Sequence, residues 1–97
     1  MLAVINVSFQ VLPQVPGGDV YRVVDRAIEV VRRSGVKHQV GPMETTMEGE
    51  LDGLLEIVKE ARQACVEAGA VRVMTLVKID YAPGGVTMEE KVGKYSL

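Results

Sequence analysis

Apolar and polar residues alternate near the start of this chain, over residues 3–11. A period of two predicts a β-strand with one apolar face and one largely polar face. Pro13 and the Pro16-Gly17-Gly18 run predict that a loop ends this strand. The apolar side holds Ala3, Ile5, Val7, Phe9 and Val11, and the other side holds Val4, Asn6, Ser8 and Gln10.

Two later stretches have apolar residues at the spacing of an amphipathic helix. The first opens at Asp19, a good N-cap, and stops at Ser34-Gly35, where glycine suits the left-handed position after a helix. The second opens at Glu50, because negative charge is favoured at a helix start, and stops at Gly69.

The remaining segments predict three more strands and a short helix. Residues 36–41 and 44–49 flank a turn at Pro42-Met43, and strands this close in sequence most simply form an antiparallel hairpin. Residues 71–79 are apolar nearly throughout, which is typical of a strand covered on both faces. Residues 87–90 have the spacing of a capping box that opens a terminal helix.

This order, β-α-β-β-α-β plus a tail helix, predicts the α+β ferredoxin-like sandwich. In that fold a four-stranded antiparallel sheet carries both helices on one face, and we expect one such domain over residues 1–97. The other face has no cover within the chain. Its expected members are Asn6, Ser8 and Gln10, joined by Thr46 and Glu48 if Met47 meets the helices, and by Met74, Leu76 and Lys78 if Val77 and Ile79 do.

Composition narrows the function classes. The apolar content is 47%, and a small apolar-rich chain often buries the excess in a subunit interface. A net charge of −2 gives no electrostatic footprint for nucleic acid. We expect neither a signal peptide nor a membrane span, and therefore a cytoplasmic protein. Cys65 is the only cysteine, which favours a packed core thiol over a disulfide or a metal ligand.

Four segments carry a more specific signal. They are Gln10-Val-Leu-Pro13, Val40-Gly-Pro-Met-Glu-Thr-Thr-Met-Glu-Gly-Glu50, Val77-Lys-Ile-Asp80 and Glu90-Lys-Val92. In these segments and their order, nearly the whole chain resembles the small thiamine-binding proteins, whose relatives bind thiamine and its hydroxymethylpyrimidine moiety. The resemblance implies sheet-to-sheet dimers that pair into a tetramer. It also implies a pyrimidine-type ligand near the subunit interface, with no cofactor and no catalysis.

Carried over by position, the resemblance implies ligand contacts at Gln10, Thr45, Thr46, Glu48 and Lys78. Two positions depart from the family pattern. His38 stands where tyrosine is more frequent, and Tyr81 stands where many relatives carry arginine. If these side chains touch the ligand, the specificity differs from that for thiamine itself.

The residue types support several of these contacts and leave alternatives open. Glu48 can accept from an aminopyrimidine amine or face a thiazolium ring, or it can pair with Lys78 across the sheet. Thr45 and Thr46 are neighbours in a strand and point to opposite faces, so only one of them shares the face of Glu48. Thr45 could instead form a hydrogen bond with the main chain of the turn. Ser8 is a further ligand candidate, and its alternative, like that of Gln10, is a hydrogen bond at a subunit interface.

No metal site is predicted, because the carboxylates at 44, 48, 50 and 52 lack a calcium-loop spacing and there is only one histidine. Three function classes remain. The first, which we prefer, is a non-enzymatic binder of thiamine or a hydroxymethylpyrimidine-like compound. The second is a small-substrate enzyme with Glu48 as base, assisted by His38 or Lys78. The third is a purely structural or regulatory oligomer.

Overall fold

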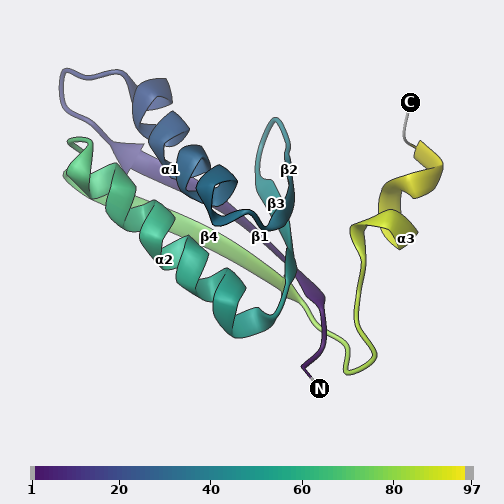
Figure 1. Ribbon diagram of the computed structural model, residues 1–97. Helices are drawn as coiled ribbons and strands as arrows, with labels where there is room; N and C mark the ends of the chain where they lie inside the picture. Colours follow the sequence, from purple (N-terminus) through teal and green to yellow (C-terminus); the bar gives the residue numbers. More distant parts are fainter. Residues whose placement is uncertain (1, 96–97) are drawn as a thin grey trace.

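A computed structural model describes residues 2–95 of the chain (Figure 1). Within these residues, no helix combines the length and the apolar character needed to cross a membrane. The elements are β1 (Ile5–Gln14), α1 (Val20–Ser34), β2 (Lys37–Val40), β3 (Thr45–Gly49), α2 (Leu51–Glu67), β4 (Arg72–Asp80), α3 (Met88–Val92) and a 3-10 turn (Gly93–Tyr95).

The four strands form one antiparallel sheet in the order β2-β3-β1-β4. Helices α1 and α2 lie side by side on one face of it, whereas α3 lies apart from them (Figure 1). This is the ferredoxin-like α+β arrangement, so the predicted fold class is confirmed. We call the sheet face away from α1 and α2 the open face.

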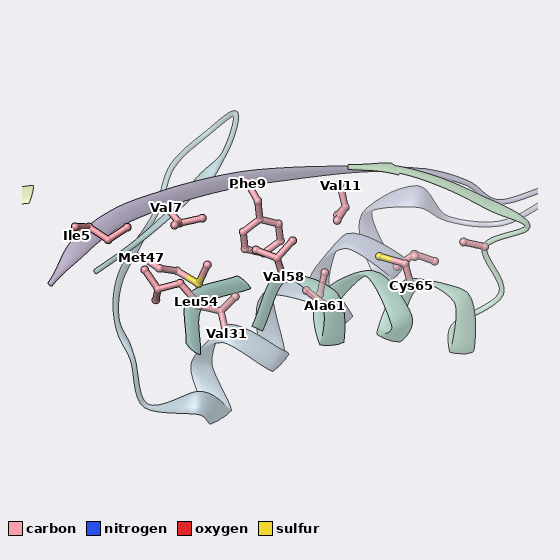
Figure 2. Close-up of a cluster of buried hydrophobic side chains, with 13 residues drawn as sticks. Ile5, Val7, Phe9, Val11, Val31, Met47, Leu54, Val58, Ala61 and Cys65 are labelled. Atoms are coloured by element: carbon pink, nitrogen blue, oxygen red, sulfur yellow. The ribbon is translucent and has the colours of Figure 1, made fainter. Parts of the chain in front are cut away.

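The core fills the space between the sheet and these two helices. The odd-numbered side chains of β1 point toward the helices, as the alternation predicts, and Val58, Ala61 and Cys65 of α2 point back at them (Figure 2). Met47 is also fully buried, so β3 turns its odd positions to the core. Each fully buried aliphatic side chain contributes about 1.5–3 kcal/mol to the free energy of folding.

The predicted helix ends are confirmed. The Asp19 carboxylate accepts from the backbone N–H of Tyr21 at 2.9 Å and caps α1. Gly35 ends this helix with φ at 74°, a conformation that costs glycine little. Thr87 and Glu90 form the reciprocal capping box at the start of α3.

The predicted end of the first strand was wrong, because β1 continues through Pro13 to Gln14. β3 reaches only as far as Phe9 along β1, so beyond that point β1 pairs with β4 alone. The Gln14 carbonyl accepts from Val71 N–H at 2.9 Å and therefore faces β4. The main chain of Pro13, one residue earlier, faces the side without a strand, where a missing N–H breaks no ladder bond.

The expectation that the last strand is covered on both faces is also not met within one chain. β4 is an edge strand, and its open-face side chains Met74 and Leu76 are 57% and 48% exposed. The α1 and α2 layer covers only the opposite face. The apolar composition of β4 is therefore not explained by packing within a single copy.

Candidate functional site

The strand register decides which candidates share the open face. Ser8 lies opposite Thr46 on one side and Lys78 on the other, and Asn6 lies opposite Glu48 and Asp80. Met47 and Ile79 lie opposite Val7, and Val77 lies opposite Phe9. All three therefore lie on the helix side of the sheet, so the conditions that the sequence set for β3 and β4 are met. The open face carries Asn6, Ser8, Gln10 and Leu12 of β1, Lys37 and Gln39 of β2, Thr46 and Glu48 of β3, and Met74, Leu76, Lys78 and Asp80 of β4.

Two hydroxyls meet at the centre of this face. Ser8 Oγ and Thr46 Oγ1 are 2.8 Å apart and share a hydrogen bond in which either atom can donate. Lys78 lies directly across from Ser8, and its Nζ contacts Glu44 Oε1 at 2.6 Å. The Ser8–Thr46 hydroxyl pair can both donate and accept hydrogen bonds, because each hydroxyl has one proton and two lone pairs.

Glu48 is nearly enclosed, with its side chain 9% exposed. Its Oε1 accepts from Met88 N–H at 2.6 Å and from Asn6 Nδ2 at 3.2 Å, while Lys37 Nζ lies 3.3 Å from Oε2. Burial raises the pKa of this carboxyl, but the hydrogen bonds from Met88 and Asn6 and the charge of Lys37 outweigh burial and hold the pKa below its ordinary value. Glu48 is therefore a well-satisfied anion, paired with Lys37 and not with Lys78.

The C-terminal segment reaches the open face at this point. Val86 N–H donates to the Val4 carbonyl at 2.9 Å, and Met88 is buried. Lys91 of α3 donates to Asn6 Oδ1 at 2.9 Å and pairs with Asp80 at 2.6 Å. Asn6, only 3% exposed, thus links Lys91 to Glu48 through both ends of its amide.

Asn6, Met88 and Lys91 line an open cavity of about 390 Å³, within the size range of small-molecule sites. We call it the tail cavity, because α3 forms one wall. Ser8, Thr46 and Lys78 were sequence candidates, whereas Gln39, Asp80 and Lys91 were missed. Its lining comprises Asn6, Ser8, Gln39, Glu44, Thr46, Lys78, Ile79, Asp80, Met88, Lys91 and Val92.

Two sequence candidates lie elsewhere. Thr45 faces the helix layer and is 6% exposed, as its parity requires. Thr45 and Gln10 both line a second cavity of about 740 Å³, which follows the unpaired side of β1 between α1 and the β2–β3 turn. The structure brings Ser8, Thr46 and Lys78 together around the tail cavity, and it brings neither Gln10 nor Thr45 there.

His38 and Cys65 are removed from the tail cavity. His38 lies opposite Met47, on the face away from Glu48, and its Nδ1 is 2.8 Å from the Val36 carbonyl oxygen. Cys65 is a buried core thiol, as predicted, and burial raises its pKa. Among residues 2–95, no three His, Cys, Asp or Glu side chains are grouped closely enough to hold a metal ion.

The sequence of the chain is similar to those of known proteins. A family model described as thiamine-binding protein matches residues 7–96. A UPF0045 protein of Clostridium perfringens is 61% identical over 90 residues, which are 93% of this chain and 95% of that protein.

Two solved structures share the fold at substantial identity. A domain of unknown function, DUF77, from Bacillus cereus has a TM-score of 0.92 and 59% identity, over 98% of this chain and 91% of that one. A Thermotoga maritima protein, assigned provisionally to thiamine biosynthesis or salvage, has a TM-score of 0.86 and 43% identity, over 96% of this chain and 98% of that one.

Proposed function

Because the chain belongs to the thiamine-binding protein family, we propose that it binds thiamine or a hydroxymethylpyrimidine-like compound in the tail cavity, without transforming it. The observation that carries the proposal is the Ser8–Thr46 hydroxyl pair, 2.8 Å apart on the floor of that cavity. An aminopyrimidine has both donors and acceptors on its ring edge. A pair of hydroxyls can serve either, since each can turn its proton to suit.

We assign the predicted residues different roles in this proposal. Ser8, Thr46 and Lys78 contact the ligand, while Met88 and Val92 of α3 supply apolar wall. Glu48 positions the site. Its Oε1 is already occupied by two donors, so it holds Asn6 and the start of α3 in place. Apolar walls with few placed polar groups are the usual form of such sites.

The proposal includes a homo-oligomer. Leu12, Met74 and Leu76 are exposed neighbours on the open face, at 43%, 57% and 48%. A second copy seated on this patch would remove apolar surface from water at about 25 cal/mol per Å². It would also close the cavity from the side opposite the sheet. Pairing of two such dimers gives the tetramer that the resemblance implies. A cytoplasmic, reducing location suits the free thiol of Cys65.

The geometry does not favour the enzymatic alternative. A general base works best with a pKa near the operating pH, whereas the surroundings of Glu48 lower its pKa. His38 lies on the other face of the sheet and cannot assist Glu48. Lys78 is paired with Glu44 and not with Glu48.

Calorimetric titration with thiamine and with hydroxymethylpyrimidine tests the proposal, with mass spectrometry of the recovered ligand as the check for turnover.

Thr46→Val keeps the side-chain shape and removes the hydroxyl, so it should weaken binding by about tenfold, the value of one hydrogen bond. Thr75→Val on β4 is the matched control, since Thr75 Oγ1 has no hydrogen-bond partner among residues 2–95. Absence of heat and of a thermal shift at millimolar ligand would refute the proposal. A purely structural oligomer would give that result with its assembly unchanged.

A further inference from the structure

The charged groups around the tail cavity are balanced in pairs. Lys78 contacts Glu44 at 2.6 Å and Lys91 contacts Asp80 at 2.6 Å, and all four residues line the cavity. Lys37 and Glu48 form a third pair, with Nζ and Oε2 3.3 Å apart. Each of these three ammonium groups therefore already has a carboxylate partner, and the charges of the three pairs sum to zero.

Such a site is poorly suited to a phosphate group. Phosphate is held by cationic side chains whose charge is not already balanced by a carboxylate, or by free N–H groups at a helix start. At the start of α3, Met88 N–H is engaged by Glu48 and Glu90 N–H by Thr87. The arginine on the open face of β4, Arg72, is six residues from Lys78, or about 20 Å along a strand.

The two carboxylates add a repulsive element. A phosphate ester that replaces Glu44 at Lys78 brings about two negative charges beside Glu44 and Asp80, both of which line the cavity. A free hydroxyl carries no such charge and is not repelled by these carboxylates. Selection between two forms of one ligand often depends on a group that disfavours the wrong form.

From this charge balance, we infer that the tail cavity selects the unphosphorylated alcohol of its ligand against the phosphate ester, and that Glu44 and Asp80 impose the selection. The inference rests on the proposed function and makes it narrower. The ligand is a neutral or cationic heterocycle with a free hydroxymethyl or hydroxyethyl arm. Its phosphorylated forms bind more weakly.

The test compares hydroxymethylpyrimidine with its monophosphate, and thiamine with its diphosphate, by calorimetry on the same protein. The wild type should bind each alcohol at least about tenfold more tightly than its phosphorylated form, a difference of about 1.4 kcal/mol. Glu44→Gln leaves Lys78 without its partner and should reduce that ratio severalfold. Asp80→Asn should do the same through Lys91, and Asp80 is exposed enough to tolerate the change.

Glu56→Gln is the matched control, because Glu56 pairs with Lys59 on α2 at 3.3 Å, away from the open face. It changes the net charge of the protein equally and should leave the ratio unchanged. Equal or tighter binding of the phosphorylated forms by the wild type overturns the inference while the proposed function stands. An unchanged ratio in both cavity variants, or an equal change in Glu56→Gln, also overturns it. Failure of all four compounds to bind the folded wild type refutes the proposed function itself.

Discussion

The carboxylate of Glu48 accepts a 2.6 Å hydrogen bond from the backbone N–H of Met88, 40 residues later in the chain. This bond attaches α3 to β3 one residue before the end of that strand. The same oxygen also accepts from Asn6, whose carbonyl oxygen accepts from Lys91 of that helix. The placement of α3, and with it one wall of the tail cavity, therefore depends on a nearly enclosed anion.

Replacing Glu48 with Gln should destabilise the protein by about 1.5–3 kcal/mol, the range for a hydrogen bond to a charged group. The amide keeps one acceptor for Met88 and Asn6 but turns a donor toward Lys37. Urea denaturation of both proteins measures the difference, with Glu56→Gln on α2 as control, expected to cost less than about 0.5 kcal/mol. Equal unfolding midpoints for wild type and Glu48→Gln would contradict this role.

The Glu48 carboxylate should also make the free energy of unfolding depend on pH in the acidic range. The pKa of Glu48 in the folded protein lies below its ordinary value of 4.5, so the unfolded chain binds the proton more readily. The stabilisation is therefore complete above about pH 4.5 and is lost as the pH falls through the lower folded-state pKa. The stability gap between wild type and Glu48→Gln should narrow below that pH. A gap that stays constant down to about pH 3 would exclude Glu48 as its source.

Cys65 should resist thiol reagents while the protein is folded. It is fully buried against the sheet, and burial raises its pKa above the ordinary value of 9.0, so little reactive thiolate forms. Labelling with a chromogenic disulfide should be slow in buffer and rapid in denaturant. Because the sequence has one cysteine, the whole signal reports this residue. Complete labelling of the native protein within minutes would show that the helix–sheet layer opens far more readily than this packing allows.

Leu76→Lys should dissociate the proposed oligomer without unfolding the subunit. The side chain lies on the open face and is about half exposed in one copy, so lysine is tolerated in the monomer but brings like charges together across an interface. Light scattering at micromolar concentration measures the mass. Val66→Lys on α2 is the control, since Val66 is equally exposed on the helix layer. A wild-type monomer would remove the basis for this prediction.

The alternation along β1 was sufficient to predict which of its side chains meet the helices, whereas the facing of β3 and β4 was predicted only conditionally. Once Ile5, Val7 and Phe9 meet the helices, antiparallel pairing places Ser8 beside Thr46 and Lys78. A turn at Pro42-Met43 also implies that Lys37 pairs with Glu48, a contact that could have been foreseen and was missed. The sequence contained enough information for this part of the site.

The contribution of the tail could not be foreseen in the same way. The capping box predicted that a helix starts at Thr87, but nothing in its residues indicates where a five-residue helix docks. The decisive donor is a main-chain N–H, which has no side-chain signature. Pro13 misled for a related reason. Proline ends a strand only if a neighbouring strand lies on the side that its missing N–H would face. At Pro13 that side is empty, because β3 pairs with β1 only as far as Phe9.

The bond between Glu48 and position 88 uses an atom that nineteen of the twenty amino acids share. Substitutions at position 88 are therefore limited by the space around the buried side chain and not by the need for a particular functional group. Only proline would remove the donor. The acceptor has less freedom, because the side chain at 48 must supply an oxygen, and only a carboxylate also forms the ion pair with Lys37. One end of this tether can vary in sequence while the other is fixed, so the tail could diversify around the cavity without being released.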